Sequence, residues 1–403
     1  MLGVLCGWLV GKPLLVVAQP IGTIFLTLLR MVIVPLVFSS IVSGVASIGN
    51  TGRLGRLGGK ALFYYVFTTL VATLTGLVVV NLVKPGVGAE LGLTAVPEGL
   101  KTSQTSLLAV FQGLFPDNPV KAAAEGQMIQ IIFFAIILGV FITRVDEKVG
   151  APLLAFFSSF FEVMMKMTRF IILLTPVGAF GLVGSIIART GFVPFVPLGL
   201  YALCVLTGLI LHAFITLPLM IRIIGGLRPI KFVRAVAPAL MTAFSTSSSS
   251  ATLPLAMECA EKRAGISNQV ASFVLPIGTT MNMNGTALYE CVAVIFIAQY
   301  YFSHGQVASL GIAQQATVVL TAILVAIGAP GIPMAGLVMM SIILNAVGLP
   351  LEGVGLILAV DRVLDMCRTT VNVWGDLCAT AIIAVSEGET VLTGPVNQET
   401  EFA

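Results

Sequence analysis

Five polar residues near the end of the chain have the types and spacing to do chemistry. Asp361, Asp365, Arg368, Asn372 and Asp376 are spaced 4, 3, 4 and 4 residues apart. At roughly 100° per residue, this spacing places all five side chains within an arc of about 80° on one helix face. A soluble helix could carry such a stripe on its wet face. In a bilayer, however, each ionisable group is costly and marks a functional site.

The composition favours the bilayer. Of the 403 residues, 57% are hydrophobic and 10% are charged, and the mean hydropathy is +1.05. A soluble fold of this composition would have far too little polar surface. The net charge of +3 is small and its Lys and Arg residues are scattered, which argues against nucleic acid as a partner. The six cysteines show no CxxC spacing, so we interpret them as apolar residues rather than a metal or disulfide framework.

A run of serines between two apolar arms is the second polar feature, at residues 245–250. In most proteins such a run is a linker. Here we expect a helix to begin near Thr252, and its free N–H groups favour an anion. A serine nucleophile would need a base, and neither His212 nor His304 falls at a convincing position. The run therefore predicts a cradle for a carboxylate.

A third polar stretch, Gly278 to Thr286, interrupts the apolar segment from Val270 to Ala298. Asn, Gly and Thr in mid-membrane predict local unwinding that frees carbonyl oxygens, the ligands that hard cations prefer. The alternative is a kinked helix with hydroxyls bonded to its own backbone. Glu290, four residues further on, could carry a proton or simply stay neutral and buried.

The apolar segments predict an all-α polytopic membrane protein with about eight transmembrane helices and two re-entrant hairpins. The first run, Leu2 to Val10, is too short to span and looks like the end of an incomplete helix. Short basic loops fall on one side, which the positive-inside rule makes cytoplasmic. The predicted spans lie within residues 21–45, 64–83, 128–143, 151–187, 198–224, 270–298 and 355–385.

Two segments have arms too short to cross separately, Ala235 to Ala260 around the serines and Ile312 to Leu349 around Gly328 to Gly336. Gly and Pro at the density of the second tip exclude a continuous helix. Non-helical backbone at membrane depth is tolerated where it lines a cavity. Two interrupted segments, each followed by a span, indicate a transporter with inverted repeats and a site near the midplane.

These motifs together resemble the glutamate transporter family, the dicarboxylate/amino acid:cation symporters that include the excitatory amino acid transporters. The matching stretches are residues 247–254, 282–290, 331–333 with Gly336, and 361–376, with smaller matches at 64–65, 118–119, Gly126 and 133–139. They cover nearly the whole chain in order.

The resemblance implies a homotrimer in which a scaffold holds mobile transport domains that move like elevators. We expect one integrated membrane domain over residues 1–386 and a polar tail over 387–403. Scaffold elements would lie mainly in 1–60, 125–145 and part of 151–224, and the transport domain mainly in 61–83 and 230–386. The hairpin at 245–250 would form the inner gate, and the one at 328–336 the outer gate.

The resemblance also implies the roles of site residues, with an acidic amino acid held by Arg368 and Asp365 and with sodium as the coupling ion. The charges agree, because a guanidinium suits a side-chain carboxylate and a carboxylate suits an α-ammonium. The expected substrate ligands are Ser247, Ser249, Thr286, Gly331, Asp365, Arg368, Thr369 and Asn372. The expected sodium ligands are Gly278, Thr280, Asn282, Ala326, Ile327, Ala329, Asn372 and Asp376, with a weakened third site at Tyr65, Thr68, Thr69, Asn282 and Asn284.

Three departures limit this correspondence. Asn284 stands where the family has an acid, Pro330 and Met334 replace smaller residues at the outer tip, and the first apolar run looks like an incomplete helix. Three aspartates against one arginine leave the stripe a charge of about −2, enough to attract two cations. We therefore expect two sodium ions, with Glu290 carrying a proton, no cofactor and no enzymatic activity.

Other functions stay open at this point. A C4-dicarboxylate or neutral amino acid symporter of the same family is one alternative, although the first has no amino group for Asp365 and the second no need of Arg368. A gated anion channel is another, since polar hairpins also build selectivity filters. In each case the expected location is the inner (plasma) membrane, with lipid, sodium ions and further copies of the chain as partners.

Overall fold

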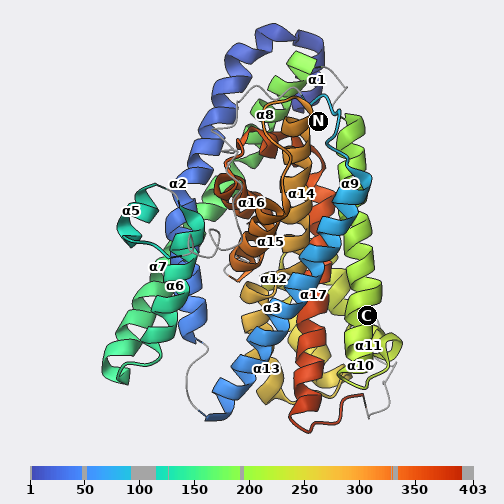
Figure 1. Cartoon of the computed structure of the whole chain (residues 1–403). Coiled ribbons are helices and arrows are strands. Elements are labelled where there is room, and N and C mark those ends of the chain that lie inside the picture. Colours follow the sequence, from blue (N-terminus) through green and yellow to red (C-terminus); the bar gives the residue numbers. More distant parts are fainter. Residues whose placement is uncertain are drawn as a thin grey trace.

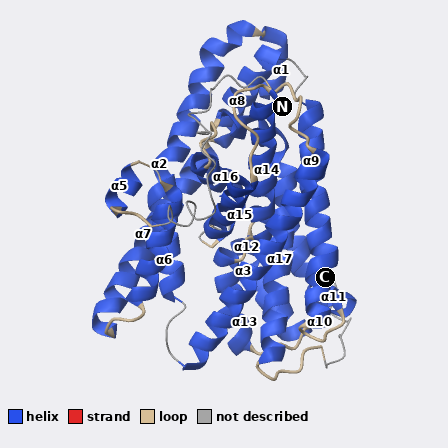
Figure 2. Cartoon of the chain, viewed as in Figure 1, coloured by secondary structure: helices blue, strands red, loops and turns tan. Residues whose placement is uncertain are grey.

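The computed structural model describes residues 2–47, 52–91, 115–125, 127–190, 195–327, 329 and 335–392. These residues form helices joined by turns and loops and contain no strand (Figure 2), as predicted. Among them, five helices are long and apolar enough to cross a membrane: Arg56–Val83, Glu147–Thr168, Val196–Ile223, Asn268–Ser303 and Ile357–Ser386. The other apolar helical stretches among the described residues, such as Lys12–Phe25 and Val34–Ala46, are shorter. The expected total of about eight crossing helices therefore stays a prediction.

One set of helices, which we call the peripheral group, packs around α2. Within it α2 contacts α6, α7 and α8, and α1 contacts α8. In Figure 1 the lower half of α2 lies with α5, α6 and α7 to one side of the remaining helices. The members are α1 (Leu2–Val10), α2 (Leu15–Ser47), α5 (Pro119–Ala124), α6 (Met128–Ile142), α7 (Glu147–Leu173) and α8 (Thr175–Thr190).

The remaining helices, which we call the core group, surround α14 and α17. Helix α14 packs against α3, α9, α15, α16 and α17, and nearly all its side chains are buried. The members are α3 (Gly52–Val83), α9 (Phe195–Leu211), α10 (Leu217–Ile223), α11 (Pro229–Thr246), α12 (Ser249–Glu258), α13 (Asn268–Met281), α14 (Asn284–Ser303), α15 (Ile312–Ala326), α16 (Ala335–Ala346) and α17 (Glu352–Ser386).

The two groups bear on the expected domain boundaries. Helix α3 runs without interruption from Gly52, so a boundary at residue 60 would fall inside one helix. Helix α9 packs against α3, α14 and α17, so this part of residues 151–224 lies with the core group. A π-helical turn over His212–Thr216 joins α9 to α10. The contacts between the groups run mainly from α8 to α17 and from α2 and α6 to α16.

Both interrupted segments form helical hairpins, because α11 packs on α12 and α15 packs on α16. The first turns at Ser247, which adopts the left-handed conformation (φ 52°). Ser248 then accepts a hydrogen bond from the Ala251 N–H and caps α12. The tip of the second hairpin, residues 328 and 330–334, lies outside the described residues. That each hairpin enters and leaves the membrane on the same side remains a prediction.

The predicted break in the membrane helix near Asn282 is confirmed. Helix α13 ends at Met281 and α14 begins at Asn284, with Asn282 (φ −117°, ψ 66°) and Met283 (φ −97°, ψ 49°) outside helical geometry. Residues around such a break lose their i to i−4 backbone bonds. The break therefore frees backbone carbonyls beside α17.

Candidate functional site

Arg368 is the centre of the site, and the stripe on α17 surrounds it with carboxylates. Its Nη1 donates to Asp361 Oδ1 (2.9 Å), its Nε donates to Asp365 Oδ1 (3.0 Å), and its Nη2 lies 2.9 Å from the same Asp365 oxygen. The arginine is 1% exposed, and both carboxylates are buried. Asp361 and Asp365 lie seven and three residues before it, so the helical repeat brings all three to one face.

The flat faces of the Arg368 guanidinium are also contacted. The Tyr289 ring of α14 lies 4.2 Å from Cζ, a cation–π distance, and its hydroxyl donates to Asp361 Oδ1 (2.6 Å). A Cβ built on Gly336 of α16 would lie 3.0, 3.0 and 3.1 Å from Cζ, Nη1 and Nη2. These nearly equal distances place Gly336 over the guanidinium plane. Only a glycine allows α16 this approach.

Asn372 links the stripe to the helix break. Its Nδ2 donates to Thr286 Oγ1 (2.9 Å) and to Met283 Sδ (3.1 Å). Its Oδ1 accepts from the N–H groups of Gly285 (2.8 Å) and Thr286 (3.3 Å) at the start of α14. One side chain of α17 therefore satisfies free backbone donors of α14. The predicted substrate ligands Thr286 and Asn372 are in direct contact.

One turn further along α17, Asp376 forms an oxygen-rich cluster with α3 and α13. Asn282 Nδ2 donates to Asp376 Oδ1 (2.8 Å), and Thr68 Oγ1 lies 3.3 Å from Asn282 Oδ1. A Cβ on Gly278 would lie 2.6 Å from Asp376 Oδ1 and 3.1 Å from the Tyr65 hydroxyl. All these side chains are buried. Carboxylate, amide and hydroxyl oxygens at a helix break suit a hard cation such as sodium.

Asn284 presents a hydrogen-bond donor to the site, in contrast to the oxygen acceptors around Asp376. Its Oδ1 accepts from the Gly285 N–H (2.9 Å), while its buried Nδ2 has no hydrogen-bond partner among the described residues. A Cβ on Gly375 would lie 2.5 Å from that nitrogen and 3.0 Å from Asn282 Nδ2. An amide N–H₂ donates and cannot ligate a cation. The unpaired group of Asn284 is therefore a donor, and its Oδ1 is already engaged by the Gly285 N–H.

Other predicted residues are buried but less directly connected. Ser249 and Thr369 are 2% and 5% exposed, and Ser247 Oγ is buried without a hydrogen-bond partner. Helix α12 begins at Ser249 rather than near Thr252 as expected, because Ser248 caps it. Thr69, Ala326, Ile327 and Ala329 are buried, and Thr280 donates to its own helix at Ile277 O (3.1 Å). Gly331 lies outside the described residues.

Glu290 follows Tyr289 on α14 and is 1% exposed. Neither carboxyl oxygen has a hydrogen-bond partner among the described residues. A buried carboxylate without a partner is very costly, whereas a protonated carboxyl is not. The position suits a group that gains and loses a proton.

The sequence reasoning did not assign roles to Tyr289 or Gly336, although both lie in the matched motifs. Tyr289 stands one turn past Gly285, on the helix that carries Thr286 and Glu290. That position was a usable signal. Gly336 gave none, because its contact with Arg368 joins helices that are far apart in the sequence.

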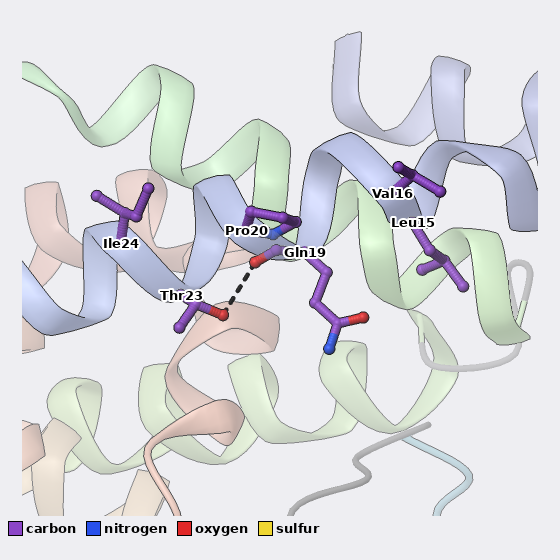
Figure 3. A pocket seen from close by; sticks show the side chains of 6 residues that line it. All are labelled: Leu15, Val16, Gln19, Pro20, Thr23 and Ile24. Carbon is purple, nitrogen blue, oxygen red and sulfur yellow. Dashed lines mark hydrogen bonds between the residues drawn. The ribbon is translucent and has the colours of Figure 1, made fainter.

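A separate shallow groove runs along α2 (Figure 3). One helix face supplies its lining, and Thr23 Oγ1 donates to the Gln19 carbonyl within it (3.0 Å). None of the lining residues is charged, so the groove offers no counter-ion to an acidic ligand. They are Leu15, Val16, Gln19, Pro20, Thr23 and Ile24.

A helical membrane protein with a buried arginine–carboxylate cluster, joined by one asparagine to an oxygen-rich cluster at a helix break, has the architecture of an ion-coupled solute transporter. The chain belongs to the sodium:dicarboxylate symporter family, whose profile matches residues 1–386. Members of this family are transporters, which agrees with the predicted absence of enzymatic activity.

Similar proteins include transporters from animals and bacteria. The chain is 36% identical over 414 residues to excitatory amino acid transporter 3 of Homo sapiens, covering 90% of this chain and 78% of the relative. It is 34% identical over 378 residues to the proton/sodium-glutamate symport protein of Geobacillus stearothermophilus, covering 92% and 88%. An excitatory amino acid transporter of Caenorhabditis elegans is 34% identical over 435 residues, covering 95% and 85%.

Proposed function

We propose that the chain is a secondary-active symporter that imports aspartate or glutamate together with sodium across the plasma membrane. The observation that carries this proposal is Arg368, buried between Asp361 and Asp365 and connected through Asn372 to the Asp376–Asn282 cluster. A substrate carboxylate would replace an aspartate at the guanidinium, and Asp365 would then hold the α-ammonium. The name of the bacterial relative includes both glutamate and sodium, the animal relatives are named amino acid transporters, and the family description includes sodium, all of which support this proposal.

The two clusters are neighbours on α17, and this proximity provides a way to couple substrate binding to sodium binding. Asn372 contacts the start of α14, where the substrate would lie, and Asp376 sits one turn away among the cation ligands. A sodium ion at Asp376 would fix the break between α13 and α14 and with it the position of Thr286. Sodium would therefore bind more tightly when the substrate is present, and the substrate more tightly when sodium is present. The two effects express one reciprocal coupling free energy.

The two packing groups support an elevator-type movement. The core group holds every described residue of both clusters, and the two hairpins α11–α12 and α15–α16 would serve as its gates. The peripheral group would be the scaffold. Only 11% of the most apolar stretch of α7 is buried, and α7 exposes Glu162 and Lys166 beside apolar residues. Lipid is a poor environment for both charges, which supports contact with other copies in a homotrimer.

For stoichiometry, two sodium ions and one proton fit the residues best. Asn284 offers a donor where a third sodium ion would need an acceptor, and neither carboxyl oxygen of buried Glu290 has a hydrogen-bond partner among the described residues. The test is the reversal potential of aspartate flux in vesicles holding the purified protein, measured in opposed sodium, proton and aspartate gradients. We expect two sodium ions and a dependence on the proton gradient. Three sodium ions without proton dependence would contradict this coupling scheme.

An anion channel remains the rival from another class, because polar hairpins can line a pore. A channel cannot set a substrate reversal potential that depends on the sodium gradient. The same flux measurement therefore separates the two functions.

A further inference from the structure

Two buried oxygen atoms next to Arg368 have no role in the contacts described so far. Asp361 Oδ1 accepts from both Tyr289 and Arg368, but Asp361 Oδ2 has no hydrogen-bond partner among the described residues. The hydroxyl of Tyr201 on α9 is likewise without a partner. Asp361 and Tyr201 are both 0% exposed. One free acceptor and one free donor therefore share a dry part of the core.

Tyr201 lies in the immediate neighbourhood of this carboxylate. Its ring centroid is 6.4 Å from that of Tyr289, whose hydroxyl contacts Asp361, and 5.0 Å from that of Phe296. Helix α9 packs against both α14 and α17. The ring of Tyr201 is thus held beside Tyr289, the donor to Asp361, while its own hydroxyl has no hydrogen-bond partner among the described residues.

Leaving both atoms unsatisfied is costly, because each has lost water without gaining a partner. Native proteins keep few such groups, and each calls for an explanation. Packing of the ring against Phe296 would be served equally well by phenylalanine. The hydroxyl therefore points to a second arrangement of the site in which it has a partner.

Substrate binding creates such an arrangement. The Arg368 Nη1 and Nε donate to Asp361 and Asp365, whereas Nη2 makes no hydrogen bond among the described residues. A substrate carboxylate bound bidentately by Nη1 and Nη2 would therefore displace Asp361 from Nη1. Asp361 would then remain charged in a dry core with Tyr289 as its single donor. A carboxylate in such a site is stabilised by hydrogen-bond donors that replace its cation. Tyr201 offers a free hydroxyl donor from α9, which packs against α17.

We propose that Tyr201 is a positioning residue that, with Tyr289, holds the Asp361 carboxylate when Arg368 turns to the carboxylate of the substrate. Two hydroxyls from α9 and α14 then take the place of one guanidinium. Tyr201 acts through Asp361 and does not touch the substrate. The inference rests on the proposed function, since it needs an acidic substrate at Arg368.

Removal of this one hydroxyl tests the inference. We expect Tyr201→Phe to raise the Kd for aspartate about tenfold at saturating sodium, the scale of a lost hydrogen bond to a charged group. Titration calorimetry on the purified full chain measures it. Tyr301→Phe is the matched control, because Tyr301 is also fully buried with a free hydroxyl. It lies twelve residues beyond Tyr289 on α14, about 18 Å along the helix, so its Kd should stay within twofold.

A double-variant cycle separates this role from packing. In an Asp361→Asn background there is no carboxylate charge to hold, so adding Tyr201→Phe should leave the Kd unchanged. A Kd for Tyr201→Phe equal to that of Tyr301→Phe would overturn the inference, as would a tenfold effect that persists in the Asp361→Asn background. If the unsubstituted protein bound no aspartate, the proposed function itself would be wrong. Aspartate binding that is unaffected by Tyr201→Phe would overturn only the role of Tyr201.

Discussion

The peripheral and core groups are both apolar helix bundles, yet they are held together differently. In the peripheral group, backbones touch through small residues. A Cβ on Gly181 of α8 would lie 2.6 Å from the Gly22 nitrogen and 2.7 Å from the Ala18 carbonyl of α2. In the core group, buried side chains such as Arg368 and Asn372 join the helices by hydrogen bonds. The first arrangement provides close, rigid contact, and the second provides a site that ligands can rearrange.

The two groups also differ in how much of their apolar surface is buried within the chain, and the core group is the more buried. The most apolar stretch of α7 is 11% buried, whereas that of α13 and α14 is wholly buried within the chain. A transporter needs one surface that faces lipid or other copies and another that excludes both. The comparison predicts that equivalent substitutions should affect binding in the core group and only stability in the peripheral group.

Loss of the central arginine should have the largest effect. Arg368→Cys leaves Asp361 and Asp365 buried without their cation, a change that costs about 3–5 kcal/mol for a broken buried pair. We expect labelled aspartate uptake to fall at least about 100-fold and small neutral amino acids to become substrates. Arg263→Cys, at an exposed arginine near the end of α12, is the control. Unchanged aspartate uptake in Arg368→Cys would remove the specificity argument.

The second-largest effect should be a change in the sodium dependence of aspartate binding when Asp376 is replaced. Asp376→Asn removes the only formal charge among the oxygens that Asn282, Thr68 and Gly278 bring together. We expect the sodium concentration for half-maximal aspartate binding to rise about tenfold or more, since cation sites depend on ligand charge. Asp146→Asn changes an exposed aspartate of the peripheral group and should leave it unchanged. Equal sodium curves for both variants would show that Asp376 does not bind sodium.

Matched glycine substitutions sharpen the comparison further. Gly336→Ala presses a methyl group onto the Arg368 guanidinium and should raise the Kd for aspartate severalfold with little change in melting temperature. Gly181→Ala meets backbone atoms of α2 that cannot move aside, and overpacking of this kind costs about 1–3 kcal/mol. It should lower the melting temperature and leave the Kd intact. The opposite pattern would contradict the division of roles.

The smallest effect concerns the end of α17. Glu387 accepts from Arg56 (2.7 Å) and Lys60 (2.6 Å) of α3, and these contacts lower its pKa from 4.5 to about 2. A lowered folded-state pKa adds stability above pH 4.5 that is lost as pH falls through about 2. Glu387→Gln should therefore lower the melting temperature slightly at pH 7, and the difference should shrink toward pH 2. Glu258→Gln, in an exposed ion pair with Lys262, is the control.

Features set by local periodicity could be predicted from the sequence. The stripe on α17 gathers around Arg368 because helical spacing alone fixes which side chains share a face. The break at Asn282 and the turn at Ser247 followed from residues that disfavour helix. The start of α12 was placed three residues too late, because each serine of the run could act as a cap and only the backbone decides which one does.

Contacts between distant segments could not be predicted. Tyr201 and Gly336 approach the stripe from two other helices, α9 and α16, and nothing in their local sequence specifies that approach. The π-helical turn at His212–Thr216 also lacked a signal, since it needs one extra residue per turn within an ordinary apolar run. The assignment of α9 to the core group likewise depends on packing alone.

Uptake of labelled aspartate into sealed vesicles that contain only this protein tests the central claim most directly. With sodium outside and none inside, the internal aspartate concentration should rise well above the external one and should fall back when the sodium gradient is collapsed. Arg368→Cys vesicles should show no such rise. Equilibration of aspartate to equal concentrations on both sides, whatever the sodium gradient, would contradict a sodium-coupled symporter.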